Sequence, residues 1–344
     1  MENLRKCFFI ITILITTIFI DLCAQGVNIP TKTWGLSFGN SPKFTGFRFN
    51  YRDTNLEKAN IFYLTLWEPY PESLTGIVNG LAIGLPLAGT GTINGISLGI
   101  GMRADINMNG LNIGGIGLGS GKNLNGLNIG GIGLGAGGDI NGITIAGIGA
   151  GSGGNIKGVT IAGLGLGAGG DISGINVGGL GLGTKGDMKG INIAGLGLGA
   201  GENLVGINIA GLGLGGGGKV IGLNIAGLGL GGGEKVAGIN IAGVGIGGKK
   251  VVGLNISAIG VGGMEVHGLT IAPLHLLIEE EGILKGISVS TYHRVKGTQG
   301  GLAIGVFNYA RKMKGLQLGV LNYVASNPKG LKLLPIFNAN FSKN

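Results

Sequence analysis

Apolar residues recur along most of this chain in a fixed phrase that opens with a glycine. With that glycine counted as position 0, apolar side chains stand at positions 1, 3, 6, 8 and 14. In one repeat they are Ile191, Ile193, Leu196, Leu198 and Leu204, after Gly190. Alternation within positions 1 to 3 and again within 6 to 8 is typical of β-strands. The pattern predicts two short strands per repeat, with these five apolar side chains facing inward and position 2 facing outward.

Glycine supplies the breaks in this pattern. The phase of the alternation changes at positions 4 and 5, usually Ala-Gly or Gly-Gly, where a bend returns both apolar pairs to one side. Positions 9 to 13, as in Gly167 to Asp171, are rich in glycine and predict a wider turn. We therefore expect each repeat to be a strand, a bend, a second strand and a turn.

The repeat has a nearly constant length. The opening glycine recurs at every sixteenth residue from Gly110 to Gly238, and spacings of 14 to 18 residues extend the register to Gly80 and Gly330. A fixed short period is the signature of a repeat architecture. We expect an N-terminal β cap over 25–79, a glycine-rich array over 80–285, and aromatic-containing C-terminal repeats with a cap over 286–344.

Two all-β folds accommodate such units. The first is a parallel β-solenoid with coils of about 16 residues and aromatic-rich caps, which requires constant spacing and similar turns. The second is an antiparallel outer-membrane β-barrel of about 16 strands, in which alternate turns differ and aromatic girdles lie at both interfaces. Here the turns are alike, and no Phe, Tyr or Trp occurs between Pro71 and Thr291. The sequence favours the solenoid and keeps the barrel as the alternative.

The first residues resemble an export signal. Arg5 and Lys6 precede an apolar run from Cys7 to Ile20, and the small Ala24 offers a cleavage point. This run is shorter than the roughly 20 residues of a transmembrane helix. We therefore expect residues 1–24 to be removed on export, with lipidation of Cys23 left open. Without this segment the chain contains no cysteine, which excludes a disulfide scaffold and a thiolate metal site.

The charge balance suggests partners without choosing among them. Formal net charge is +9, and it is unchanged when residues 1–24 are removed, because they contain two charges of each sign. A basic exported protein is suited to envelope glycans or anionic lipid, and repeats of this kind also suit self-association. Membrane association is left open, and no nucleic-acid partner is expected. The same charge also serves solubility.

Position 2 is the most distinctive polar column, because it is Asn or Thr throughout the regular array. We expect it to face outward as a ladder, either stabilising the stack through amide hydrogen bonds or binding a repetitive ligand such as a glycan or a second copy. The candidate ligand-facing residues are Asn112, Asn128, Thr144, Thr160, Asn176, Asn192, Asn208, Asn224, Asn240, Asn255 and Thr270.

Position 13 forms a second polar column, which begins with Asn and Asp and continues with Lys. Its members are Asn123, Asp139, Asn155, Asp171, Asp187, Asn203, Lys219 and Lys235. Calcium between neighbouring carboxylates is one interpretation, but the spacing departs from known calcium-binding repeats and lysine interrupts the column. Turn formation by Asp and Asn is the simpler interpretation, so no metal and no cofactor are expected.

No catalytic constellation emerges from the sequence. The three histidines, His267, His275 and His293, are scattered, and the run from Glu279 to Glu281 is typical of a solvated turn. The many Gly-x-Gly stretches lack the helix and the acidic residue that a dinucleotide-binding loop requires. We therefore expect a protein that is not an enzyme.

At Gly301-Leu-Ala-Ile-Gly-Val-Phe-Asn-Tyr309 and Gly315-Leu-Gln-Leu-Gly-Val-Leu-Asn-Tyr323, the chain resembles bacterial exported surface-repeat proteins, a family with short glycine-opened repeats. The resemblance covers roughly residues 76–341 and implies a cell-surface or outer-membrane location without enzymatic activity. It brings no site residues to carry over. We expect a structural or adhesive role, with a pore or surface protein of the outer membrane as the alternative.

Overall fold

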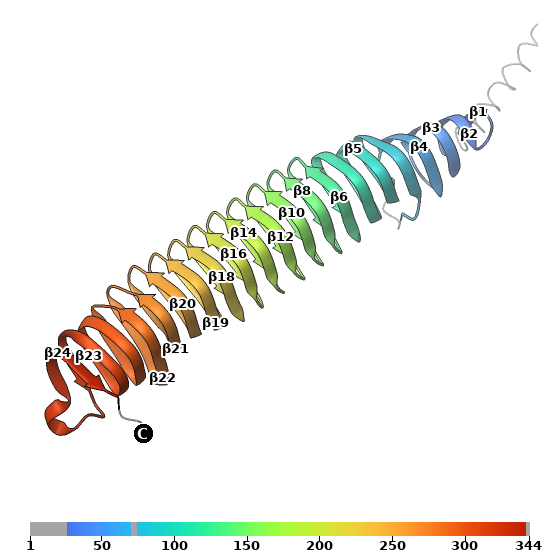
Figure 1. Cartoon of the computed structure of the whole chain (residues 1–344). Coiled ribbons are helices and arrows are strands. Elements are labelled where there is room, and N and C mark those ends of the chain that lie inside the picture. Colours follow the sequence, from blue (N-terminus) through green and yellow to red (C-terminus); the bar gives the residue numbers. More distant parts are fainter. Residues whose placement is uncertain (1–25, 70–73, 342–344) are drawn as a thin grey trace, which may run out of the picture. The chain divides into compact units, whose positions relative to one another are not determined.

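A computed structural model describes residues 26–69 and 74–341. The expected export signal, with Cys7, Cys23 and Ala24, lies outside the described residues. The chain divides into two compact units, one ending at Lys157 and one beginning at Gly158. Each unit consists almost entirely of β-strands (Figure 1). Within the described ranges, no helix is long and apolar enough to cross a membrane.

The first unit stacks its coils in parallel. β3 pairs with β4, β4 with β5, and β6 with β8, each in parallel register. Leu124 lies opposite Ile140, so the offset between coils equals the 16-residue repeat. Its strands are β1 (Val27–Pro30), β2 (Trp34–Phe38), β3 (Lys43–Arg52), β4 (Lys58–Trp67), β5 (Ile77–Ser120), β6 (Asn123–Gly130), β7 (Gly133–Ala136), β8 (Ile140–Ala146) and β9 (Gly149–Ser152).

The coils of the second unit also stack in parallel register. The boundary between the two units falls within β10, the first strand of the second unit. Its strands are β10 (Ile156–Ala162), β11 (Gly165–Ala168), β12 (Ile172–Gly178), β13 (Gly181–Thr184), β14 (Met188–Ala194), β15 (Gly197–Ala200), β16 (Leu204–Ala210), β17 (Gly213–Gly216), β18 (Lys219–Ala226), β19 (Gly229–Ala242), β20 (Gly245–Ser257), β21 (Gly260–Ile271), β22 (His275–Val289), β23 (Tyr292–Val324) and β24 (Leu333–Asn340), with one 3-10 turn, η1 (Lys329–Leu331).

A central coil consists of one long and one short strand. In the coil of Gly190, β14 covers positions 14 to 4 and β15 covers positions 7 to 10. Asn192 of β14 lies opposite Asn208 of β16, and Leu198 of β15 lies opposite Leu214 of β17, both in parallel register. Identical positions therefore stack into columns. The predicted parallel β-solenoid is confirmed, and the antiparallel alternative is wrong.

The opening glycine is required by the backbone. Gly190 and Gly206 have φ angles of 115° and 124°, in the region that L side chains avoid. A Cβ at Gly190 would also come within 3 Å of the backbone carbonyl oxygen of Gly174 in the preceding coil. The same two constraints apply at every regular coil, which explains the sixteen-residue spacing of this residue.

Antiparallel strands cover both ends of the chain's stacked coils. β1 pairs antiparallel with β2, and β24 folds back antiparallel on the last coil of β23. An exposed parallel edge would otherwise present unpaired backbone groups. Parallel pairing of β2 with β3 and of β3 with β4 continues the coil register upstream of residue 80. The region expected as an N-terminal cap therefore contains coils of its own.

The repeat positions whose side chains point into the solenoid differ from those predicted from the sequence. Positions 8 and 14 are buried as expected, as shown by Leu198 and Leu204, and the small residue at position 4, such as Ala194, is buried with them. Positions 1, 3 and 6, however, point outward. The strand alternates without interruption from position 14 through the opening glycine, so positions 14, 2 and 4 face inward and positions 1 and 3 face outward, as in Met188 to Ala194 of β14. The predicted inward facing of positions 1, 3 and 6 is wrong.

Candidate functional site

The Asn/Thr column at position 2 lies inside the solenoid. All eleven predicted residues, Asn112, Asn128, Thr144, Thr160, Asn176, Asn192, Asn208, Asn224, Asn240, Asn255 and Thr270, have side chains that are at most 1% exposed. The expectation that they face outward toward a ligand is therefore wrong. Buried polar groups require hydrogen-bond partners, and the stacked amides supply them to one another.

The hydrogen bonds of this ladder run in one direction. The Nδ2 atom of Asn192 donates to Oδ1 of Asn208 at 3.0 Å, and Asn208 donates in the same way to Asn224 at 2.9 Å. The chain of donors continues through Asn240 and Asn255 and ends on the hydroxyl of Thr270. Only an in-register parallel stack brings identical amides into this geometry. The ladder therefore has a structural role.

Threonine weakens the ladder where it replaces asparagine. The buried Oγ1 of Thr160 and the buried Oδ1 of Asn176 in the next coil have no hydrogen-bond partner. The threonine side chain is shorter than that of asparagine, so its hydroxyl does not span the distance between coils. In the first unit, the donor bond from Asn128 to Thr144 is correspondingly long, at 3.4 Å.

The position-13 column stabilises turns. Oδ1 of Asp187 accepts hydrogen bonds from the backbone nitrogen of Asn203 at 3.0 Å and from its Nδ2 at 2.9 Å. A salt bridge from Lys189 and these bonds from Asn203 lower the pKa of Asp187. Asn123, Asp139, Asp171 and Asn203 likewise accept a hydrogen bond from the backbone nitrogen one coil further on, so these Asn and Asp side chains bind the turn of the following coil. Among residues 26–69 and 74–341, no three His, Cys, Asp or Glu side chains gather closely enough to hold a metal ion.

The outward-facing columns at positions 1, 3 and 6 form the most unusual surface of the second unit, and we call them the apolar face. The position-6 side chains are 42–56% exposed: Leu164, Leu180, Leu196, Leu212, Leu228, Val244, Ile259 and Leu274. Beside them, position 1 presents residues such as Ile175, Ile207 and Ile239, and position 3 presents residues such as Ile161 and Ile193. Soluble monomers rarely expose contiguous apolar patches above a few hundred Å², so this face suits a binding role.

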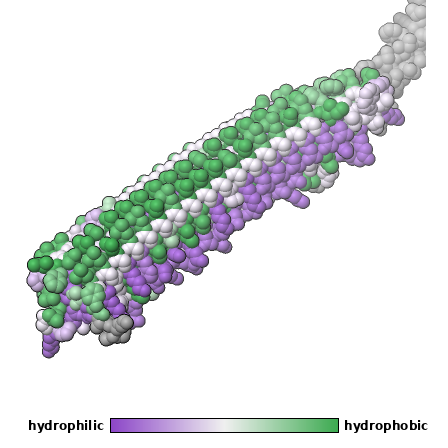
Figure 2. All heavy atoms as spheres, viewed as in Figure 1, coloured by the Kyte–Doolittle hydropathy of each residue, from purple (hydrophilic) through white to green (hydrophobic). Residues whose placement is uncertain are grey.

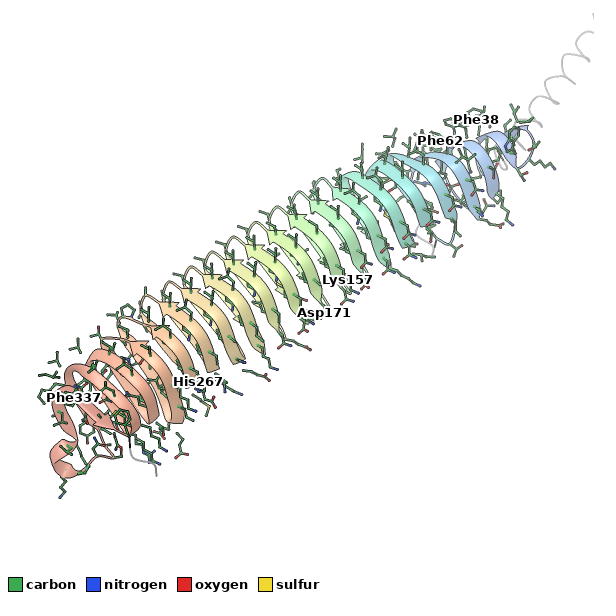
Figure 3. All side chains as sticks on the ribbon, viewed as in Figure 1. Phe38, Phe62, Lys157, Asp171, His267 and Phe337 are labelled. Carbon is green, nitrogen blue, oxygen red and sulfur yellow. The ribbon has the colours of Figure 1, made fainter. Side chains whose placement is uncertain are left out.

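Figure 2 shows the apolar face of the second unit as a hydrophobic band, with hydrophilic residues gathered along the opposite edge and a pale stripe between them. Asp171 and His267 project from that hydrophilic edge (Figure 3). Between residues 158 and 278, every Asp, Glu, Lys and Arg stands at positions 11 to 15. Apolar and charged residues are therefore separated on the coil.

The first unit exposes equivalent columns. Ile116, Ile132 and Ile148 at position 6 are about half exposed, and Leu127 and Ile143 are exposed at position 1. Toward the N-terminus, aromatic rings replace the aliphatic side chains: the ring of Phe47 contacts that of Phe62 in a tilted arrangement, and Phe38 stacks on Phe49 with ring centroids 5.4 Å apart. Phe38 and Phe62 project outward from this unit in Figure 3.

Two further glycine columns line the outer side of the short strands. At Gly199, Gly213 and Gly229, a Cβ would meet no atom within 4 Å, and none of the three has a positive φ. Glycine there is not required by the coil, in contrast to position 0. The columns leave this side of the solenoid flat. At the C-terminal end, His275 lies opposite Gly260 of the position-7 column and Tyr292 lies opposite His275. The rings of His275 and Tyr292 stack 5.4 Å apart, and Phe307 stacks on Tyr292 at the same distance.

The C-terminal coils present aromatic and basic side chains together. A shallow hollow is lined by Glu280, Tyr292, Arg294, Lys296, Tyr309 and Arg311. The ring of Tyr309 stacks on that of Tyr323 at 5.6 Å, and Lys296 lies 3.6 Å from Glu279. Aromatic faces beside guanidinium groups suit flat, anionic ligands.

Two polar clusters were not predicted from the sequence. In the first unit, an asparagine column at position 15 forms a second ladder with the opposite direction, in which Nδ2 of Asn125 donates to Oδ1 of Asn109 at 2.7 Å. The recurrence of Asn immediately before the opening glycine was the available signal.

Near the N-terminus, Asp53 is buried and accepts hydrogen bonds from Arg48, Asn50 and Tyr63. Burial and the nearby Asp53 raise the pKa of Tyr63 well above its usual value. No sequence pattern indicated this cluster.

Comparisons with protein-family models, curated proteins and solved structures find no match to this chain. The resemblance to exported surface-repeat proteins therefore stays a prediction, and the functional argument depends on the geometry.

Proposed function

We propose that this protein is a non-enzymatic, exported repeat protein of the bacterial cell envelope, with a structural or adhesive role. Its working surface is the apolar face, in place of the Asn/Thr ladder that the sequence suggested. The observation that carries the proposal is the unbroken exposure of eight apolar side chains at position 6 of the second unit. Exposing that much apolar surface to water is costly, so the face is expected to meet another surface.

The repetitive character of the surface supports a structural or adhesive role. Each coil presents the same apolar positions about 4.8 Å from those of the next coil, and solenoids use such extended surfaces for binding. A row of this kind suits an extended or repetitive partner. The basic residues Arg5 and Lys6, followed by the apolar run from Cys7 to Ile20, support export.

Export and adhesion are tested in cells that produce the full chain. We expect a mature N-terminus at Gln25, recovery in the envelope fraction and labelling by antibody on intact cells. Cells producing the wild type should adhere to one another or to a surface, and Leu196→Lys with Leu212→Lys should abolish adhesion. Glu202→Lys, which changes the net charge by the same +2 at the turn, is the matched control. Retention of the unprocessed chain in the cytoplasm would refute the proposal, as would unchanged adhesion of the lysine variant.

The aromatic and basic hollow of the C-terminal coils favours a second candidate function, the binding of an acidic envelope polymer. Arg294 and Arg311 are both exposed beside tyrosine rings. Arg294→Ala with Arg311→Ala should weaken retention on an acidic polysaccharide, and wild-type retention should fall with salt because exposed charges are screened. Lys329→Ala with Lys332→Ala removes the same charge outside the hollow and serves as the control. Equal retention of the two variants would argue against this site.

A further inference from the structure

We propose that the partner of the apolar face is the apolar face of a second copy of this chain, so that two solenoids pack side by side. This inference depends on the proposed function and names the occupant of its working surface. Three properties of the second unit favour a second copy over lipid or a glycan: the area of the face, the placement of the charges, and the spacing of the side chains.

The area of the face is close to what a stable dimer buries. The strip from position 1 to position 6 is at most roughly 17 Å wide, the extended length of five residues at 3.3 Å each, and the bend between the two strands narrows it; eight coils at about 4.8 Å give roughly 40 Å of length. The product is at most about 650 Å² per copy from the second unit alone, of the same order as the ~800 Å² per partner of a standard interface.

The charges allow two copies to approach each other. In residues 158–278, positions 0 to 10 contain no Asp, Glu, Lys or Arg, so apolar faces meet without burying a charge. The charged edge of this stretch is nearly balanced, with six Lys against five Asp or Glu. Several of these are paired, as Lys250 is with Glu265 at 2.6 Å and Lys189 with Asp187 at 2.7 Å. An anionic lipid surface would be matched by a basic rim around the apolar face, and this edge does not provide one.

The spacing of the side chains favours a partner with the same repeat. Successive position-6 side chains, such as Leu196, Leu212 and Leu228, stand one strand spacing apart on rigid, hydrogen-bonded coils. A second copy has ridges and gaps of identical period, so its side chains can interdigitate along the whole face, as identical sheets do in dry interfaces. Lipid tails have no such period. The repetition that builds the solenoid therefore also makes its face self-complementary.

Light scattering after size exclusion in detergent-free buffer tests this proposal on the purified full-length protein. We expect the wild type to have the mass of two chains and to dissociate on dilution. Leu196→Lys with Leu212→Lys should shift the mass to one chain, because it buries four charges in a paired interface. Glu202→Lys, with the same added charge at the turn, should remain at two chains.

A second, less disruptive variant distinguishes a loss of pairing from a loss of folding. Leu196→Ser with Leu212→Ser should weaken pairing in the same direction, with circular dichroism reporting the retained β-structure of each variant. A monomeric wild type overturns the inference, whether or not it binds vesicles of anionic or neutral lipid. A lysine variant that remains dimeric overturns it as well, by placing the interface elsewhere. If the wild type is monomeric but the lysine variant still abolishes adhesion of cells, the proposed function stands and only its partner changes.

Discussion

Asn192 and Ile193 are neighbours in the chain and face opposite sides of the same strand: the amide is fully buried, and the isoleucine is 37% exposed. This arrangement reverses the usual placement of polar and apolar residues. It is stable inside because Nδ2 of Asn192 donates to Oδ1 of Asn208 at 3.0 Å, and it leaves apolar residues outside for a partner. The ladder and the apolar face are thus two consequences of one strand orientation.

Interruption of the buried ladder should destabilise the fold. Asn208→Leu removes an acceptor from Asn192 and a donor from Asn224, which leaves two buried polar groups unpaired. We expect the free energy of unfolding to fall by about 2–4 kcal/mol, measured by urea denaturation. Ile207→Thr changes the adjacent outward position and should cost less than about 1 kcal/mol. Equal costs for the two variants would contradict the inward placement of the asparagines.

The glycine columns should differ sharply in their tolerance of alanine. Gly190→Ala places a Cβ at a φ of 115° and against the carbonyl of Gly174, and we expect it to cost about 3 kcal/mol or more. Gly199→Ala meets no atom within 4 Å and should change stability by less than about 0.5 kcal/mol. Thermal unfolding of the two variants checks the difference. A tolerated Gly190→Ala would refute the coil geometry.

One position in the opening column carries isoleucine instead of glycine. Ile61 pairs with Gly46 on one side and Gly80 on the other, and its φ angle is 83°. A β-branched residue in that region is strained by about 1–3 kcal/mol, whereas glycine adopts it freely. We expect Ile61→Gly to raise the free energy of unfolding by about 1 kcal/mol after the entropic cost of glycine. Ile77→Gly, at an exposed position with ordinary backbone angles, should have the opposite effect, and a fall in stability for both would contradict the prediction.

Acid should destabilise the C-terminal coils through His293. This histidine is fully buried, with Nε2 3.0 Å from the hydroxyl of Ser288, and burial lowers its pKa from 6.5 to about 4. Between those values the unfolded histidine takes up a proton that the folded one refuses, so stability is present above pH 6.5 and declines as the pH falls toward 4. The loss is about 3 kcal/mol.

Urea denaturation at several pH values measures this loss. His293→Gln should flatten the decline between pH 6.5 and 4, whereas His275→Gln, which alters a partly buried ring stacked on Tyr292 and removes only the smallest contribution to the low pKa of His293, should preserve most of it. An unchanged slope in the His293 variant would show that other groups cause the acid sensitivity.

The sequence by itself determined the repeat and its length, and it favoured parallel stacking. Gly190 and its equivalents recur because each coil needs a positive φ at the same point, and Asn192 recurs as Asn208 because stacked amides can donate and accept along the column. A fixed period with uniform turns favoured strands of one direction, and the parallel pairing of β14 with β16 decided against the barrel. These properties are local, and the pattern of residues records them directly.

Only the tertiary structure decided which side of each strand faces the interior of the solenoid. Alternation gives two faces, and hydrophobicity alone assigned Ile193 to the core and Asn192 to the surface. A stack of amides satisfies its own hydrogen bonds, which removes the usual penalty for burying asparagine. This effect does not exist in a single repeat, because it arises only when coils lie on top of one another.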